Sequence, residues 1–164
     1  RRIVNTIRLA APFFGKFRLR PNSLNPDKIS LEWQERTLDS YFNASALSDG
    51  TLRFMALVTL LQQPVELMPA TILVDEPELG LHPAAITLLA EMLQAAAQVR
   101  QVIVSTQSVT LVNQLTPEDL LIVEREDNAS VFKRLDAKHL ANWMEGYSLG
   151  ELWEKNLIGS RPGA

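Results

Sequence analysis

The chain has 164 residues, a length that suits one domain with a sizeable core. Hydrophobic residues make up 46% and charged residues 21%, which is ordinary for a globular protein and argues against global disorder. The net charge of −3 gives no general attraction for nucleic acid, and the lack of cysteine excludes disulfides and thiolate metal sites. No apolar run is long enough for a bilayer and no secretory signal opens the chain, so we expect a cytoplasmic protein without membrane insertion.

The first 46 residues are polar, with scattered aromatic residues, and we expect them to form an N-terminal strand and loop segment (1–46). Residues 2–10 predict a short helix that ends before Pro12. Alternation of apolar and polar residues over 16–20 and over 29–34 predicts two strands that pair antiparallel across a turn rich in Pro and Asn. Six basic residues and no acidic residue lie in the first 20, which indicates either a DNA-facing patch or, as we favour, a solvated strand face.

From residue 47 onward, apolar runs alternate with turn signals, which predicts an α/β fold with a mostly parallel sheet flanked by helices. The runs at 71–74 and 102–104 predict strands buried on both faces. We divide this part into a core at 47–135 and a C-terminal helical tail at 136–164. The other expected elements are helices at 51–63, 83–97, 110–115, 136–144 and 148–156, and strands at 120–124 and 131–135 that form a hairpin around Asp127-Asn128. The helix at 83–97 has Pro at its first turn and an apolar face made of Ile86, Leu89, Leu93 and Ala96.

Two carboxylates follow the first of these apolar strands directly, at Asp75 and Glu76. Acids at the end of a buried strand are costly unless a cation or a hydrogen bond compensates them, and Mg²⁺ prefers carboxylate oxygens. Neighbouring strand residues point to opposite sides, so Asp75 could hold a hydrated metal while Glu76 orients or deprotonates an attacking water. The alternative is an acidic turn after a core strand, with Glu78 simply solvated.

A possible phosphate-facing helix start lies upstream, at Ser48 and Gly50. Ser48 is a natural N-cap, and Gly50 leaves room where a ligand could approach the backbone. A helix N-terminus presents unpaired N–H groups and a partial positive charge, which attract phosphate. Taken alone, an ordinary capped helix is the better interpretation of so short a motif.

The second apolar strand also ends in polar residues, Ser-Thr-Gln-Ser at 105–108. In parallel sheets the chemistry lies at the carboxyl ends of the strands. Gln107 can hydrogen-bond a phosphate oxygen or a water, but it cannot carry positive charge or shuttle a proton as His can. The alternative is a polar cluster that caps the helix expected at 110.

Together, and in this order, the three segments resemble a known family. Residues 73–83, LVDEPELGLHP, resemble the Walker B motif and D-loop of ABC-type ATPases, especially the SMC/RecF-like and predicted bacterial AAA-type ATPases. Residues 47–51, LSDGT, resemble the ABC signature, with Asp49 and Thr51 where many transporters have Gly and Gln. Gln107 stands where the family carries its switch residue, usually His. The fold implied is the C-terminal half of an ABC-type P-loop NTPase domain.

This resemblance implies roles for the site residues. Asp75 would organise Mg²⁺, Glu76 would activate water, and Gln107 would sense the γ-phosphate of ATP. Ser48 and Gly50 would contact the γ-phosphate of an ATP held by the opposite subunit. The implied ligands are ATP and Mg²⁺, and the implied assembly is an ATP-sandwich dimer, with DNA or an effector protein as a further partner.

The chain has no P-loop of the form GxxxxGK[ST]. The one Gly-Lys pair, Gly15-Lys16, is followed by Phe17, and Ala10 stands where the first glycine would be. We therefore expect these residues alone to bind ATP poorly. We expect the P-loop to lie upstream in a longer protein; the alternative is a P-loop borrowed from another subunit.

The resemblance predicts ATP hydrolysis that couples ATP-driven dimerisation to a DNA-repair or defence process. One alternative is a nucleotide-gated interaction module with little turnover, which Gln107 favours slightly. Another is the ATPase subunit of an ABC transporter, which neighbouring genes for membrane permeases would support.

Overall fold

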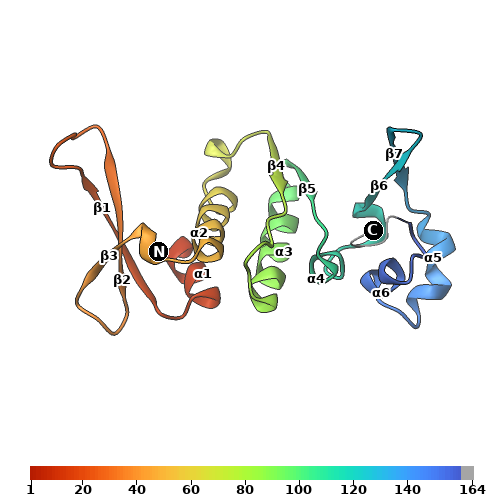
Figure 1. Ribbon diagram of the computed structural model, residues 1–164, viewed down its shortest axis with the longest axis horizontal. Helices are drawn as coiled ribbons and strands as arrows, with labels where there is room; N and C mark the ends of the chain where they lie inside the picture. Colours follow the sequence, from red (N-terminus) through yellow and green to blue (C-terminus); the bar gives the residue numbers. More distant parts are fainter. Residues whose placement is uncertain (160–164) are drawn as a thin grey trace. The chain divides into compact units, whose positions relative to one another are not determined.

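The computed structural model describes residues 1–159, so the end of the predicted C-terminal tail, 160–164, lies outside the described residues. The chain forms two compact units (Figure 1). The first comprises Arg1–Leu73 and Pro77–Ile103, and the second comprises Val74–Glu76 and the chain from Val104 onward. None of the helices in the described part combines the length and the hydrophobicity that a bilayer span needs.

Three helices pack together in the first unit: α1 (Arg2–Ala10), α2 (Asp49–Leu61) and α3 (Pro83–Ala97) (Figure 1). The predicted bounds of α1 and α3 are confirmed, while α2 begins and ends two residues earlier than expected. Apolar residues at helical spacing supply the packing surface, as predicted for α3. The side chains buried between the helices include Ile7, Phe54, Val58, Ile86, Leu89, Leu93 and Ala96.

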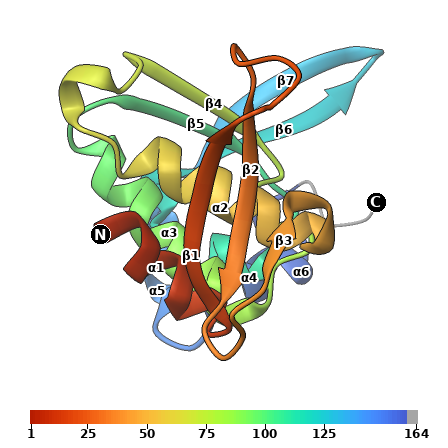
Figure 2. The ribbon, with the colours of Figure 1, turned by 90° about the vertical axis from the view of Figure 1, so that its left-hand side faces the viewer.

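A three-stranded antiparallel sheet precedes the signature-like segment. It consists of β1 (Phe14–Pro21), β2 (Ile29–Glu35) and β3 (Tyr41–Asn43), with β2 in the middle (Figure 2). The predicted pairing of the first two strands is confirmed, and β3 was not predicted. Trp33 on β2 packs against aromatic rings on either side. The centroid of its ring lies 5.6 Å from that of Phe13 and 5.2 Å from that of Phe42.

Three of the six basic residues in the first 20 have partners within the unit. A guanidinium N–H of Arg2 donates to the backbone carbonyl of Gln62 at 2.6 Å. Arg8 Nε donates to a backbone carbonyl of β1 at 3.0 Å. Arg18 lies 3.7 Å from Glu32 and stacks over the ring of Tyr41 at 4.1 Å from its centroid. These contacts favour a structural explanation for three of the six basic residues.

The central parallel pair consists of β4 (Thr71–Asp75) and β5 (Gln101–Ser105). At one end Gln101 N donates to the carbonyl of Ala70 at 3.1 Å, and at the other Glu76 N donates to the carbonyl of Ser105 at 2.9 Å, so the strands run in the same direction. The prediction that both strands are buried on both faces is wrong. Ile72 is buried, but Leu73 is 74% exposed and Ile103 is 47% exposed. The reason is that this sheet has two strands within the described residues, and the side chains on one face have no cover there.

The second unit contains the end of the central strands and the C-terminal elements. Val112 and Leu120 pack with Leu149 and Trp153 in its core. Its helices and strands are α4 (Val109–Val112), β6 (Leu121–Glu126), β7 (Ala129–Arg134), α5 (Ala137–Met144) and α6 (Leu149–Glu154); short 3-10 turns lie at Ala44–Ala46, Val65–Leu67 and Pro117–Asp119 along the chain.

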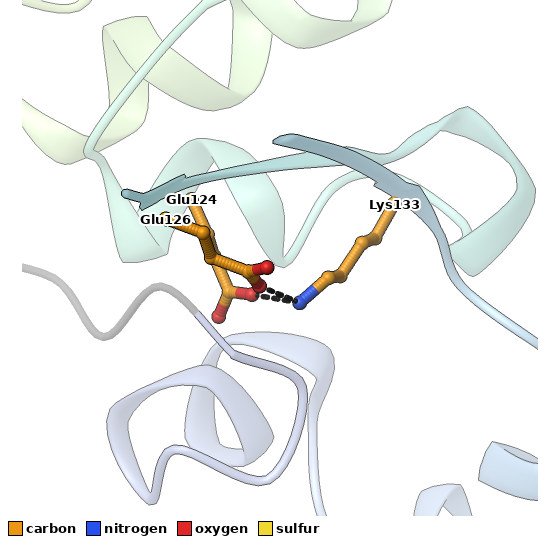
Figure 3. Close-up of polar contacts among 3 residues, drawn as sticks. All are labelled: Glu124, Glu126 and Lys133. Atoms are coloured by element: carbon orange, nitrogen blue, oxygen red, sulfur yellow. Dashed lines mark hydrogen bonds and ion pairs between the residues drawn. The ribbon is translucent and has the colours of Figure 1, made fainter. Parts of the chain in front are cut away.

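The predicted hairpin around Asp127 and Asn128 is confirmed as β6 and β7. Both turn residues have positive φ, 47° and 64°, as the tight hairpin turn with matching twist requires. On one face, Lys133 Nζ donates to Glu124 at 2.5 Å and Glu126 at 2.7 Å (Figure 3). These hydrogen bonds raise the pKa of Lys133. Their contribution to the stability of the fold is therefore present at neutral pH and is lost only as the pH rises through that raised pKa.

Helix α6 is anchored to α4 through a glycine, which gives a testable prediction. Gly150 N donates to Asn113 Oδ1 at 2.6 Å, and a Cβ at this position would lie 2.6 Å from Val109 Cγ1. We expect Gly150→Ala to lower the free energy of unfolding by about 1–3 kcal/mol, the usual cost of overpacking. Denaturant titration of the protein measures the change. Gly146→Ala is the control, because a Cβ there meets nothing within 4 Å; an equal loss in both variants would contradict the prediction.

Candidate functional site

The end of β4 places two carboxylates side by side in the chain. Asp75 is the last residue of the strand and is exposed, and Glu76 follows it half-buried. Glu76 has a φ of +41°, a left-handed conformation that is unfavourable for a residue with a side chain. Its backbone N–H still donates to Ser105 O, so pairing with the end of β5 maintains this turn. Non-glycine residues held in this conformation cluster at functional sites.

The end of β5 supplies the partners of both carboxylates. Ser105 Oγ donates a hydrogen bond to Asp75 Oδ1. Gln107 Nε2 donates to Glu76 Oε1 at 2.7 Å. The predicted site residues Asp75, Glu76 and Gln107 therefore come together in the second unit. Ser105 is the additional member: the sequence placed it in a polar strand end but gave no signal that it would bind Asp75.

The donor chemistry of this cluster fits Mg²⁺. No group of three or more His, Asp or Glu residues among residues 1–159 could hold a metal by itself. Mg²⁺, however, is usually held by one or two carboxylates together with water and substrate phosphates. Asp75 offers an exposed carboxylate oxygen of that kind, and the hydroxyl of Ser105 fixes its orientation. Asp75 is thus suited to hold a metal that a nucleotide brings with it.

The signature-like segment forms the start of α2 in the first unit. Ser48 is the N-cap, and its Oγ accepts a hydrogen bond from Thr51 N at 3.2 Å. Asp49 is exposed in the first turn, where a negative charge is favourable next to the helix dipole. Gly50 is buried. The predicted capping role of Ser48 is confirmed, and a phosphate contact from Ser48 or Gly50 stays a prediction.

Gly50 lies against the backbone of the segment that follows Asp75-Glu76. A Cβ on Gly50 would lie 2.1 Å from the carbonyl oxygen of Gly80 and 2.7 Å from its carbonyl carbon. Gly80 has a φ of +76°, which favours glycine. The sequence alone did not single out Gly80, because a contact between backbones 30 residues apart leaves no local signal.

The D-loop-like segment (residues 77–82) leads directly into α3. Pro77 and Glu78 are buried. Leu81 N donates to the carbonyl of Glu78 at 3.0 Å and closes a turn. His82 is the N-cap of α3, where its Nδ1 accepts from Ala84 N at 3.3 Å. The segment therefore contains a closed turn and leads into α3 through the His82 cap, within the first unit.

Solved structures with a similar fold include heads of SMC ATPases. One comes from "Structural biochemistry of ATP-driven dimerization and DNA stimulated activation of SMC ATPases" and matches with a TM-score of 0.63 and 17% identity over 88% of this chain and 87% of that chain. A second is an SmcHead bound to the C-winged helix domain of ScpA, with a TM-score of 0.67 and 17% identity over 86% of this chain. A third is the Smc head domain with a coiled coil and joint from Pyrococcus yayanosii, with a TM-score of 0.63 and 19% identity.

These matches establish the fold, and the α/β class expected from the sequence is confirmed. The chain spans 43% of the length of the second structure and 28% of the third. No curated protein sequence matches the chain.

A family model does match. It is described as "AAA domain, putative AbiEii toxin, Type IV TA system", and it aligns with residues 2–113. That range includes α2, the carboxylates at the end of β4, the D-loop-like segment and Gln107. The expected relation to ABC/SMC-like AAA-type ATPase domains is confirmed by this match together with the fold. Because the model covers well over half of the chain, this protein belongs to that family of AAA domains.

Proposed function

We propose that the chain carries the hydrolytic half of an ATP site that uses Mg²⁺. The observation that supports this most directly is the hydrogen bond between Gln107 and Glu76, next to the one between Ser105 and Asp75, at the carboxyl ends of two paired parallel strands. Strand ends of this kind are where α/β folds place their ligands. A cluster that merely ended a strand would not need a left-handed Glu76.

In this proposal each side chain has one role. Asp75 holds Mg²⁺, which supplies charge neutralisation at the phosphates when it is bound. Glu76 orients the attacking water and accepts its proton. Gln107 keeps the Glu76 carboxylate in place by donating from Nε2. The amide group has a second N–H, which could donate to a phosphate oxygen.

We further propose that the P-loop lies outside residues 1–164. Two observations support this: the sequence contains no GxxxxGK[ST], and the parallel pair leaves Leu73 and Ile103 exposed. An apolar strand face without cover is suited to pack against further structure. The experiment is a comparison of ATP affinity between residues 1–164 and the full reading frame. Equal affinity in the two would contradict this part of the proposal.

Self-association follows from the incomplete site. In the proposed dimer, Ser48 and Gly50 of one subunit complete the nucleotide site of the other. The support is that a protein of the same fold is reported for ATP-driven dimerisation. Light scattering of the full-length protein with ATP, ADP or no nucleotide tests it. A mass that stays that of one subunit at saturating ATP would contradict it.

The process served by this ATPase is proposed to be DNA repair or defence. The description of the family as part of a toxin–antitoxin system favours defence, and the DNA-stimulated activation reported for an SMC ATPase of this fold favours a DNA-linked activity. Hydrolysis measured with and without double-stranded DNA tests the DNA-linked activity. Stimulation supports a DNA-linked role, and an unchanged rate over a range of salt concentrations removes it.

A second candidate is a nucleotide-gated interaction module with little turnover, which the choice of Gln107 favours. An amide cannot carry positive charge or relay a proton. Slow hydrolysis together with ATP-dependent dimerisation would support this candidate.

The contact of Gln107 with Glu76 gives a prediction for either candidate. We expect Gln107→Ala to lower kcat by about 10- to 100-fold, since a hydrogen bond to a charged group is worth about 1.5–3 kcal/mol. KM should change less than kcat, because the contact that Gln107 makes in the structure is to Glu76. Gln107→His, which retains a donor, should keep or raise kcat. Steady-state kinetics of the full-length protein measures both, and a Gln107→Ala enzyme with the native kcat would contradict the role given to Gln107.

A further inference from the structure

Gly50 and Gly80 form a contact for which the proposed chemistry gives no reason. A phosphate contact at the start of α2 would explain a missing side chain on the outside of the helix. Gly50, however, is buried, and what approaches it is the carbonyl group of Gly80. The approach is close from both sides, because a Cβ on Gly80 would lie 3.2 Å from Gly50 Cα and 3.4 Å from Gly50 N.

We propose that this pair, which we call the glycine joint (Gly50 and Gly80), fixes the D-loop-like segment to the start of α2, so that both present themselves to a second subunit as one body. The inference rests on the proposed ATP-dependent dimer. It adds two positioning residues and a reason for their small size. Neither glycine needs to touch the nucleotide for the joint to act.

The surroundings of the joint make it rigid. On one side, Ser48 caps α2 immediately before Gly50. On the other, the turn closed by Leu81 N on Glu78 O precedes the His82 cap of α3. Helices α2 and α3 also pack on each other through buried side chains. The segment between Pro77 and His82 therefore has little freedom to move without moving α2.

Both glycines are required for different physical reasons. At Gly50 the obstacle is contact, because a methyl group at 2.1 Å from a carbonyl oxygen cannot be accommodated without moving backbone. At Gly80 the main obstacle is the φ of +76°, which an alanine adopts only with strain. Either substitution should push the D-loop-like segment away from α2 without replacing either of the carboxylates Asp75 and Glu76.

The test uses the full-length protein with Glu76→Gln, so that ATP is not consumed while dimers form. We expect Gly50→Ala and Gly80→Ala each to raise the dimer dissociation constant with ATP by about 10-fold or more, which corresponds to the cost of left-handed strain at Gly80 and of overpacking at Gly50. The affinity of the separated subunit for a fluorescent ATP analogue should stay within about twofold, because Gly50 is proposed to contribute only to the nucleotide site of the opposite subunit. Gly146→Ala, with open space around it, should behave as the parent.

The double variant distinguishes a joint from two independent contacts. If Gly50 and Gly80 act through one contact, the double variant should dimerise about as poorly as the worse single variant. If each touched the nucleotide separately, the two effects would add, and that result would overturn the inference. Native dimerisation of both single variants would overturn it as well.

Two further comparisons keep the result interpretable. Where Gly50→Ala fails to fold, Gly80→Asn replaces it, because asparagine tolerates a positive φ and therefore tests the contact alone. The dimerisation of Gly80→Asn should lie between that of Gly80→Ala and that of the parent. A loss equal to that of Gly80→Ala would show that strain at Gly80 is not the cause and would overturn the role given to its positive φ. If the parent itself stays monomeric with ATP, the proposed dimer fails. If the parent forms dimers and the joint variants do so equally well, only the inference fails.

Discussion

Replacing Glu76 with Gln should lower the rate of ATP hydrolysis by the full-length protein by about 10²- to 10⁴-fold, the range that a positioned general base contributes. The substitution keeps the size and shape of the side chain and removes its ability to accept a proton. The amide oxygen can still accept from Gln107 Nε2, which lies 2.7 Å from Glu76 Oε1, so the turn after β4 should keep its geometry. Nucleotide binding should persist, and ATP-bound dimers should accumulate.

The measurement is single-turnover hydrolysis at saturating ATP and Mg²⁺, combined with light scattering to follow dimers. Glu91→Gln is a matched control, because Glu91 is an exposed acid on α3. The control should hydrolyse ATP at the native rate. If Glu76→Gln also does so, Glu76 is not the base and the proposed hydrolytic site is wrong. If hydrolysis stops and dimers still fail to accumulate, the base is supported and the ATP-sandwich assembly is not.

The features that the sequence predicted well are those that depend on neighbours along the chain. The bounds of α3 follow from Pro83 at its first turn and from apolar residues at helical spacing, and its predicted face is buried. The β6–β7 hairpin follows from Asp127 and Asn128, whose side chains tolerate a left-handed backbone. The apolar run at 71–74 was sufficient to place the carboxylate pair at a strand end.

The features that it missed depend on residues far apart in the chain. Strand β3 is three residues long and is defined by its pairing with β2, above all by Phe42 opposite Trp33. The exposure of Leu73 depends on which strands flank β4. The sequence pattern of an apolar strand is the same in a two-stranded sheet as in the middle of a large sheet. The approach of Gly50 to Gly80 joins two backbones, so the side-chain pattern of neither segment contains it.

The same distinction explains which residues of the candidate site the sequence identified. Asp75, Glu76 and Gln107 were identified because polar residues at the ends of apolar strands are unusual for a core. Ser105 was not, because serine at a strand end is common and its role depends on the particular oxygen that it faces. In the structure that oxygen belongs to Asp75. Ser105 therefore links Asp75, whose substitution is expected to have a large effect, to the end of β5.

Replacing Asp75 with Asn should separate metal binding from folding. The amide oxygen can still accept from Ser105 Oγ, so the end of β4 should remain intact, and the thermal midpoint should change little. The metal, however, loses its anionic ligand. Loss of an outer-shell partner already costs metal affinity about 10- to 100-fold, so we expect the Mg²⁺ concentration for half-maximal hydrolysis to rise by about 100-fold or more. The maximal rate should fall with it, because charge neutralisation at the phosphates is part of catalysis.

A magnesium titration of hydrolysis at fixed ATP tests this, with Asp39→Asn as control, since Asp39 is an exposed acid in the loop between β2 and β3. Ser105→Ala provides the intermediate case. It removes the hydrogen bond that orients Asp75 and keeps the charge, so it should shift the magnesium midpoint by less than Asp75→Asn does. An unchanged midpoint in Asp75→Asn would show that the metal is held elsewhere. A loss of thermal stability in Ser105→Ala that exceeds any loss in Asp75→Asn, with unchanged magnesium midpoints, would instead make the pair a structural cap of β4, because Ser105→Ala removes the hydrogen bond while the amide oxygen of Asp75→Asn still accepts it.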